Sequence, residues 1–277
     1  MKPHTFHAMG TEWSLVAANA DDLLRDAEGL VRWLELRLSR FNPDSALSAL
    51  NRDRRSADPL LGQLVRVALT WRTRTLGLLD PTLGGTLASL GYARSFEEVD
   101  GRPSAPVDAR PSVTLEGEEI LLHGDGELDL GGIAKGWAVD QVARRLVLRG
   151  VRYALVDGGG DLRAIGGPWS VGVGDDDAIV LRGDAVATSS TLRRAWRAAD
   201  GTPMHHVLDP RTGRPSVSAI TTSVVRASDA TTADALATAL LIDPEKILPL
   251  LPSFGASARV ADAEGVWWTT TDWEQAA

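Results

Sequence analysis

Two glycines followed by a lysine form the part of this chain that is best suited to holding a phosphate. A short predicted strand over 127–130 runs into Gly131 and Gly132. A helix is expected over 133–149, so Lys135 would lie in its first turn. That turn has free N–H groups and a partial positive charge, to which a lysine adds a full charge. The spacing matches neither a Walker A loop nor a dinucleotide fingerprint, and an ordinary tight turn between strand and helix is the alternative.

An aspartate and a threonine one helical turn apart form a second candidate site. Asp234 and Thr238 lie at positions i and i+4 of a helix predicted over 230–241, which puts both side-chain oxygens on one face. A carboxylate and a hydroxyl suit Mg²⁺, which usually completes its shell with waters and substrate phosphates. The alternative is structural: Asp234 would complement the helix dipole, and Thr238 would pack in the core.

Two adjacent histidines precede a strong turn signal at 209–213. Side chains of neighbouring residues on a strand point to opposite faces, so at most one of His205 and His206 enters a given site. A neutral histidine beside a phosphate can act as a general base, whereas a structural or surface role is the alternative. The chain has no G-x-S-x-G sequence, so a serine hydrolase has no support.

The elements that must position these residues change in type along the chain. Apolar residues at helical spacing predict helices over 21–39 and 59–76. From residue 112 onward the apolar period is two, which is typical of strands. The expected strands of this part include 113–115, 119–122, 127–130, 153–156, 162–165 and 220–227. A further helix is expected over 244–251. Helices first, and then a mostly antiparallel sheet with helices packed on it, indicate an α+β protein. We expect a single domain over 1–277, helix-rich over 1–110 and sheet-rich over 111–277.

Composition and charge narrow the class of protein. With 44% hydrophobic residues and a net charge of −8, the chain is typical of a globular protein and an unlikely partner for nucleic acid. It has no cysteine, which excludes disulfides, thiol catalysis and Cys-ligated zinc. No apolar run approaches the roughly 18 residues of a membrane-spanning helix, and residues 1–9 lack the apolar core of a signal peptide. The expectation is a cytoplasmic location for the chain as given, with an extracytoplasmic location after loss of a leader left open.

An ordered set of short motifs resembles the FAD:protein FMN transferase family, whose members are also called ApbE-like proteins. The matching motifs are AMGT at 8–11, SRFNPDS at 39–45, DPT at 80–82, DLGGIAKG at 129–136, DGGGD at 157–161, ATS at 187–189, HVLDPRTG at 206–213 and ADALAT at 233–238. Each motif is short, but the order of the whole set is specific and covers most of the chain.

The resemblance implies an α+β, T-fold-like protein that binds FAD with Mg²⁺. Such an enzyme transfers FMN to a Thr or Ser hydroxyl of an acceptor protein and releases AMP. Two other functions stay open on the sequence. One is an FAD pyrophosphatase, with water as the nucleophile and FMN and AMP as products. The other is a flavin-binding protein without catalysis.

The resemblance also assigns roles to individual residues. The expected FAD contacts are Met9, Phe41, Asp80, Asp129, Lys135 and Thr188. The expected Mg²⁺ ligands are the carbonyl of Ala134 and the side chains of Asp234 and Thr238. His206 matches the proposed catalytic histidine. Two positions differ from the usual pattern of the family: Phe41 stands where tyrosine is common, and Ser190 stands where glycine is usual.

Overall fold

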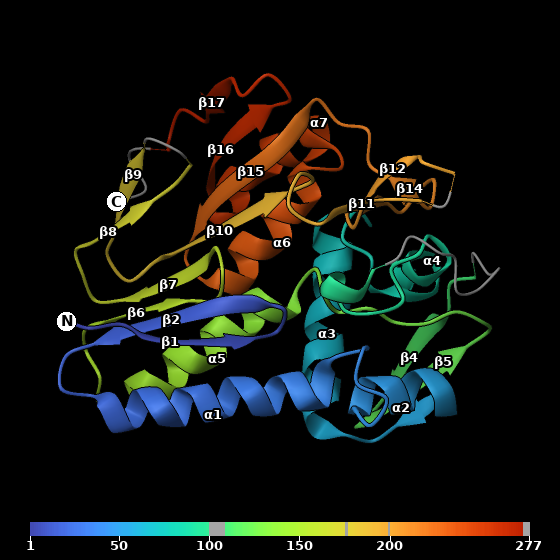
Figure 1. Ribbon diagram of the computed structural model, residues 1–277, viewed down its shortest axis with the longest axis horizontal. Coiled ribbons are helices and arrows are strands. Elements are labelled where there is room, and N and C mark those ends of the chain that lie inside the picture. Colours follow the sequence, from blue (N-terminus) through green and yellow to red (C-terminus); the bar gives the residue numbers. More distant parts are fainter. Residues whose placement is uncertain (100–108, 175–176, 199, 274–277) are drawn as a thin grey trace. The chain divides into compact units, whose positions relative to one another are not determined.

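The computed structural model describes residues 1–99, 109–174, 177–198 and 200–273, and the chain divides into two compact units (Figure 1). The first unit consists of Met1–Trp33, Ile133–Ser190 and Ser218–Ala277. The second consists of Leu34–Gly132 and Thr191–Val217. The units therefore alternate along the sequence, and the expectation of a single domain over 1–277 stays a prediction.

An antiparallel sheet forms the frame of the first unit. Among the described residues it has eight strands in the order β1-β2-β6-β7-β10-β15-β16-β17, and each neighbouring pair is antiparallel. The strands are β1 (His4–Ala8), β2 (Thr11–Ala17), β6 (Ala154–Asp157), β7 (Asp161–Ile165), β10 (Ala185–Ser190), β15 (Ile220–Ala227), β16 (Ser257–Asp262) and β17 (Trp267–Thr269). The prediction of a mostly antiparallel sheet in an α+β protein is confirmed.

Two helices, α5 (Ala134–Leu148) and α6 (Ala230–Leu240), pack on this sheet and on each other. α5 contacts β7, and α6 contacts β10 and β15 (Figure 1). Every residue of α6 except Thr238 is buried, as expected for a helix that is apolar nearly all round. Asp229 caps α6, since its side chain accepts a hydrogen bond of 2.8 Å from the Thr232 N–H. The helix therefore holds Asp234 in the interior and leaves Thr238 partly accessible.

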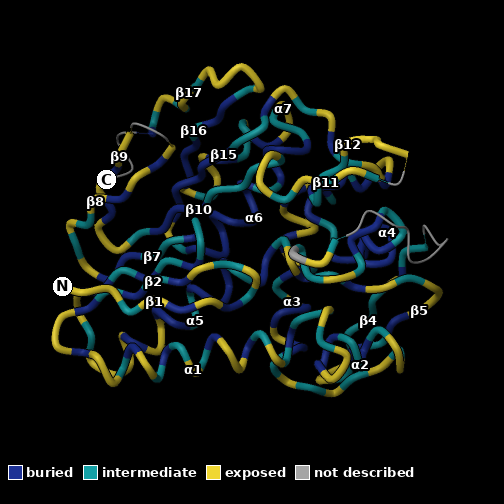
Figure 2. The backbone as a smooth tube through the Cα atoms, viewed as in Figure 1, coloured by how far each residue is buried: buried dark blue, intermediate teal, exposed yellow. Residues whose placement is uncertain are grey.

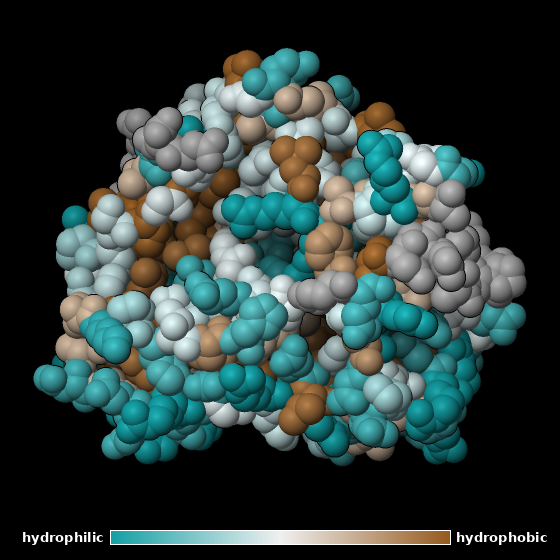
Figure 3. Space-filling view, in the orientation of Figure 1, coloured by the Kyte–Doolittle hydropathy of each residue, from teal (hydrophilic) through white to brown (hydrophobic). Residues whose placement is uncertain are grey.

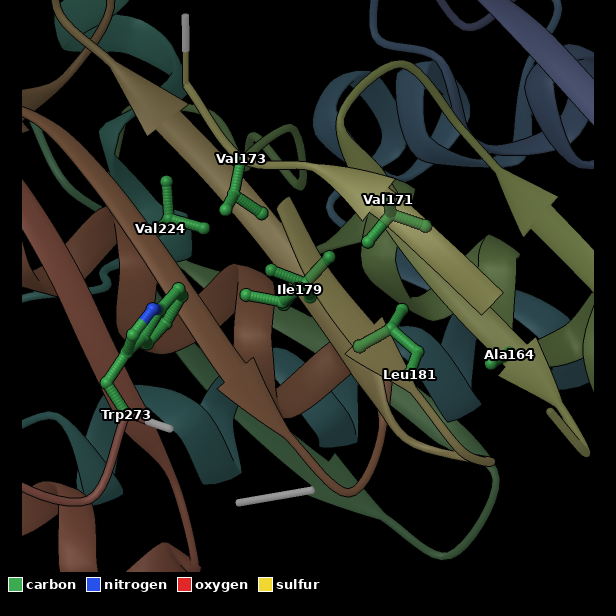
Figure 4. Packing of buried hydrophobic residues seen from close by; sticks show 8 residues of the cluster. Ala164, Val171, Val173, Ile179, Leu181, Val224 and Trp273 are labelled. Atoms are coloured by element: carbon green, nitrogen blue, oxygen red, sulfur yellow. The ribbon is translucent and has the colours of Figure 1, made fainter. Parts of the chain in front are cut away.

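The apolar core of the first unit continues beyond the main sheet to a hairpin. This hairpin pairs β8 (Trp169–Gly172) with β9 (Ala178–Leu181). Its inward-facing residues Val171, Ile179 and Leu181 pack with Ala164, Val173, Val186, Val224 and Trp273 (Figure 4). The burial map shows buried and intermediate residues along β7, β10 and β15, and none of their residues is exposed (Figure 2). Figure 3 shows apolar surface between the hairpin and strands β7 and β10. Partly buried hydrophobic residues, among them Leu162 and Trp169, pack against this core.

Helix α1 (Asp21–Leu38) begins in the first unit and ends in the second. Asp21 and Asp22 lie in its first turn and Arg37 in its last, where these charges complement the helix dipole. Its buried residues recur at spacings of three and four, namely Leu24, Ala27, Val31, Leu34 and Leu38. The helix predicted over 21–39 is thus confirmed to within one residue.

Short helices and small sheets make up the second unit. Its helices are α2 (Ala46–Asp53), α3 (Pro59–Arg74), η1 (Pro81–Leu83), α4 (Gly84–Ser89) and η2 (Phe96–Glu98). Its strands are β3 (Arg55–Ser56), β4 (Ser112–Glu116) and β5 (Glu119–His123) in one sheet, the pair β11 (Ala195–Arg197) and β12 (Pro203–His205), and the pair β13 (Leu208–Asp209) and β14 (Arg214–Pro215). Leu83, Leu87, Tyr92 and Leu208 form a buried cluster there, which joins the segment 191–217 to the rest of the unit.

Two sequence predictions differ from the structure. Residues 127–130 form no strand, because their backbone groups bond to the short helices η1 and α4 instead: the Asp129 N–H donates to the Pro81 carbonyl at 2.8 Å, and the Gly84 N–H donates to the Glu127 carbonyl at 3.0 Å. The helix predicted over 244–251 is the short α7 (Pro244–Ile247) followed by the 3₁₀ segment η3 (Leu248–Phe254). Within the described ranges, no helix is both long enough and apolar enough to cross a membrane.

Candidate functional site

The predicted site residues fall into two sets, one in each unit. Met9, Ala134, Lys135, Thr188, Asp234 and Thr238 belong to the first unit, and Phe41, Asp80, Asp129 and His206 belong to the second.

In the first unit, the predicted metal ligands surround the start of α5. The Asp234 side chain is buried, and its Oδ2 accepts a hydrogen bond of 3.0 Å from the Gly136 N–H. Ala134 is the first residue of α5 and lies in the same turn as Gly136. Thr238 lies one turn after Asp234 on α6, and its Oγ1 is 3.2 Å from Oγ of Ser189. The fold therefore brings all three predicted ligands to one region of this unit.

The donor set in this region fits Mg²⁺. It offers one carboxylate, one hydroxyl and one backbone carbonyl, all of them hard oxygen ligands. The described part of the chain contains no group of three or more His, Cys, Asp or Glu side chains that could hold a metal. An ion at Asp234 would therefore need further oxygens from substrate phosphates and water, which is the usual manner of Mg²⁺ binding.

The phosphate site expected at the start of α5 is already partly engaged by protein groups. The ammonium group of Lys135 forms an ion pair with the carboxylate of Asp161, whose side chain is only 1% exposed. The Gly136 N–H is bonded to Asp234, as described above. One helix N–H and the lysine charge thus already have carboxylate partners, which the sequence did not predict.

The glycine-rich segment 157–161 is the turn of a β-hairpin. β6 and β7 pair antiparallel on either side of it, and the Asp157 Oδ1 accepts hydrogen bonds from the Gly159 and Gly160 N–H groups at 2.8 and 3.0 Å. Burial raises the pKa of Asp157, while those two hydrogen bonds oppose the rise. Gly159 has φ of +76°, and a Cβ there would lie 1.9 Å from Oγ1 of Thr11, so only glycine fits.

This turn lies beside Thr188 and beside the turn that contains Met9. The Thr188 N–H donates to the Gly160 carbonyl at 2.9 Å. Met9 lies in the turn between β1 and β2, with φ of +53°, two residues before the Thr11 that contacts Gly159. Asp161, the first residue of β7, holds Lys135, so this hairpin is linked to the start of α5.

In the second unit, Arg40 joins two of the predicted residues. Its guanidinium group forms an ion pair with Asp129, donates to the Tyr92 carbonyl at 2.5 Å, and lies 4.3 Å from the centre of the Phe41 ring. The Arg40 side chain is 5% exposed, whereas Phe41 is 38% exposed. An arginine over an aromatic face is an attractive cation–π contact, so Arg40 supports the Phe41 ring from one side.

Sequence reasoning missed Arg40, because nothing in Ser39-Arg-Phe41 reveals a partner 89 residues away. The only available signal was that an arginine inside a predicted site motif needs an acid when it is buried.

Asp80 acts as a structural cap in the second unit. Its Oδ1 accepts hydrogen bonds from the Thr82 N–H at 3.0 Å and the Thr82 hydroxyl at 2.8 Å, and its Oδ2 lies 3.2 Å from Nη2 of Arg72. Both carboxylate oxygens thus have protein partners, which fits a role in shaping the loop at 80–82. Its predicted contact with FAD stays a prediction.

The two histidines lie at the end of β12 and have different surroundings. Nε2 of His205 is 3.2 Å from the Ser216 carbonyl, so this nitrogen carries the proton and donates. Burial lowers the pKa of His205, although the hydrogen bond to Ser216 opposes this. His206 follows the strand, and its N–H donates to the Arg194 carbonyl at 3.2 Å. The structure gives His205 a structural role and leaves the catalytic role of His206 a prediction.

Comparison with known proteins identifies the relatives of this chain. The ApbE family matches residues 9–259. A FAD:protein FMN transferase of Treponema pallidum is 31% identical over 282 residues, covering 86% of this chain and 76% of the relative. One of Escherichia coli K12 is 28% identical over 258 residues, covering 82% and 73%. The crystal structure of an ApbE protein from Thermotoga maritima superposes with a TM-score of 0.88 at 26% identity, covering 99% of this chain and 98% of the other.

These similarities confirm the predicted fold class and the expectation that the chain is an enzyme, since the curated relatives are transferases. The family match extends over the motifs at 9–11, 129–136, 187–189 and 233–238, which contain all the candidate residues of the first unit. The chain therefore belongs to the ApbE family.

Proposed function

We propose that this enzyme transfers FMN from FAD to a Thr or Ser hydroxyl of an acceptor protein, releases AMP, and requires Mg²⁺. The relatives named above carry the name FAD:protein FMN transferase, which gives the reaction class. The Mg²⁺ requirement, the acceptor hydroxyl and the release of AMP rest on the argument that follows.

The observation that carries the proposal is the balance of charge at the start of α5. Asp161 and Asp234 both reach this helix start, whereas Lys135 is the cation paired there. Burial weakens solvent screening, so a pyrophosphate brought to these carboxylates would be strongly repelled. A divalent cation bound by Asp234, Thr238 and the Ala134 carbonyl would offset that repulsion, and when bound it would supply charge neutralisation on the transferred phosphate.

The proposed reaction is a phosphoryl-group transfer. The acceptor hydroxyl oxygen attacks the phosphorus of the FMN phosphate, and the bond from that phosphorus to the oxygen shared with AMP breaks. AMP leaves with that oxygen and its negative charge. His206 takes the proton of the hydroxyl, which it can do only in its neutral form. Phe41 binds an aromatic ring of FAD by stacking, and Lys135 binds a phosphate oxygen.

The proposal is tested by incubating the protein with FAD, Mg²⁺ and a candidate acceptor flavoprotein, followed by mass spectrometry of the acceptor and analysis of free nucleotides. We expect covalent FMN on the acceptor and one AMP for each FMN attached. Asp234→Ala should abolish transfer, and His206→Ala should lower its rate by about 10²–10⁴-fold with FAD affinity nearly intact. His205→Ala is the matched control and should transfer at nearly the wild-type rate.

The outcomes separate the competing functions. Equal release of FMN and AMP with and without the acceptor would identify an FAD pyrophosphatase instead. Tight FAD binding with no AMP under any condition would identify a binding protein without catalysis. If His205→Ala were the damaging change and His206→Ala were silent, the assignment of the base would be wrong.

A further inference from the structure

Each of the helices α5 and α6 donates N-terminal N–H groups to an aspartate of the other helix. Asp140, in the second turn of α5, accepts hydrogen bonds from the Ala230 N–H at 3.0 Å and the Thr231 N–H at 2.8 Å, both in the first turn of α6. In return, Asp234 of α6 accepts from the Gly136 N–H in the first turn of α5. Each helix thus binds N–H groups that the other leaves without an intrahelical partner. The two carboxylates act as a reciprocal clamp.

The clamp holds two helices that are in direct contact. A Cβ added at Gly136 would lie 2.5 Å from the Ala230 carbonyl oxygen and 2.7 Å from Cβ of Asp234, which are atoms that cannot move independently of α6. The missing side chain at Gly136 therefore sets how closely the helices approach. Asp140 lies four residues further along α5, about one turn away, and holds the N-terminal end of α6.

Both oxygens of Asp140 are engaged by protein groups. Its Oδ1 also accepts from Nη1 of Arg163 on β7 at 3.0 Å, and its Oδ2 also accepts from the Thr231 hydroxyl at 2.5 Å. The side chain is 18% exposed. Four donors on one carboxylate leave no favourable position for a substrate or metal contact, so Asp140 can act on the reaction only through the helices that it joins.

The residues on either side of the clamp are the predicted metal ligands. Ala134 lies at the start of α5, whereas Asp234 and Thr238 lie on α6, so the ligand set is divided between the two helices. Mg²⁺ requires nearly ideal octahedral geometry with short ligand distances, and it tolerates a displaced ligand poorly. Any change in the spacing of α5 and α6 would therefore change the affinity of the site for Mg²⁺.

We propose that Asp140 is a positioning residue that sets the geometry of the Mg²⁺ ligands by fixing the N-terminus of α6 to α5. This inference rests on the proposed function, because it takes the metal site from there. It differs from simple stabilisation of α6, a role that Asp229 already fills as the N-cap of the same helix.

Asp229 provides a matched control for the experiment. Asp140→Ala and Asp229→Ala each remove a carboxylate that accepts N–H groups of the first turn of α6, but only Asp140 belongs to α5. Removing a helix-capping side chain usually costs about 0.5–2 kcal/mol of stability. Urea unfolding measures this loss of stability for both variants, so that their Mg²⁺ affinities are compared with the stability of each variant known.

Metal binding is measured without the transfer reaction. Mg²⁺ is titrated into protein with FAD bound, and the metal affinity is followed by calorimetry and by the rise in Tm that binding produces. We expect Asp140→Ala to weaken Mg²⁺ binding by about 10–100-fold, the range for residues that orient metal ligands. Asp229→Ala should stay within about threefold of wild type. In the transfer assay, Asp140→Ala should raise the Mg²⁺ concentration for half-maximal rate more than it lowers the rate at saturating Mg²⁺.

A milder variant keeps the test valid if Asp140→Ala does not fold. Thr231→Val removes the hydroxyl donor to Asp140 and leaves the Thr231 N–H in place, so it should weaken Mg²⁺ binding in the same direction by a smaller factor. Thr231→Ser should restore wild-type affinity. Wild-type Mg²⁺ affinity in both Asp140→Ala and Thr231→Val would overturn the inference. If wild-type protein bound Mg²⁺ but transferred no FMN, the proposed function would fail while the positioning role could still be measured.

Discussion

Gly136→Ala is the substitution whose effect follows most directly from the packing of α5 on α6. The added Cβ would lie 2.5 Å from the Ala230 carbonyl oxygen, where ordinary contacts begin at 3.4 Å, so α6 would have to withdraw by about 0.9 Å. Overpacking of this kind costs about 1–3 kcal/mol. Alanine favours a helix over glycine by about 1 kcal/mol, which acts in the opposite direction. Together these give a net loss of about 0–2 kcal/mol, and because the obstructing atom is buried backbone, we expect a value in the upper half of that range.

Gly29→Ala is the same chemical change with the opposite expected sign. Gly29 is an exposed residue in α1, and a Cβ there would have no atom within 4 Å, so only the gain in helix preference remains, about 0.5–1 kcal/mol. Urea denaturation compares both variants with wild type, and the midpoints should move in opposite directions at an unchanged slope. A midpoint for Gly136→Ala that rose as far as that of Gly29→Ala would refute the claim that the two helices are in contact at Gly136.

Three further predictions concern the second unit. Arg40→Met leaves the Asp129 carboxylate without its buried partner and should cost about 3–5 kcal/mol in urea unfolding, most of which the added change Asp129→Asn should restore. Phe41→Ala should weaken FAD binding by about 1–3 kcal/mol in a fluorescence titration, with little effect on the transfer rate at saturating FAD; unchanged affinity would make Phe41 a packing residue. Because burial lowers the pKa of His205, its neutral form stabilises the fold above the unfolded pKa of about 6.5, and this stability is lost as the pH falls through the lowered pKa. The decline in Tm from about pH 8 to about pH 5 should therefore be smaller in His205→Gln than in wild type.

The sequence predicted those helices and strands whose residue pattern is sufficient without knowledge of their neighbours in the fold. β15 has the predicted bounds, 220–227, because its run of β-branched residues favours a strand without reference to its neighbours. The segment 127–130 alternates between charged and apolar residues, yet it forms no strand. The Leu128 N–H bonds to Oδ1 of Asn51 at 2.8 Å, so a side chain far away in the sequence takes the place of a partner strand. Local alternation cannot show whether a partner exists.

The sequence predicted which residues belong to the candidate site better than it predicted the contacts between them. The motif around Asp234 places a carboxylate in an apolar helix, which indicates a buried partner. It does not identify that partner as the Gly136 N–H, 98 residues away in sequence. The same holds for Asp140: the sequence places it on the helix that follows the glycines, but it does not show that Asp140 joins this helix to α6. Such contacts depend on how elements pack, and that information is not local.

The pair formed by Lys135 and Asp161 constrains how a phosphate can bind in the proposed reaction. Oδ2 of Asp161 bonds to Lys135, and its other oxygen is buried without a hydrogen-bond partner among the described residues. If a phosphate removed Lys135 from this pair, Asp161 would be left as a buried charge without its cation, at a cost of about 3–5 kcal/mol. An ammonium group has three N–H donors, so Lys135 can bind a phosphate oxygen while it keeps its bond to Asp161. The pair then offers little net positive charge, so in the proposed reaction a cation at Asp234 would have to balance the charge of the pyrophosphate.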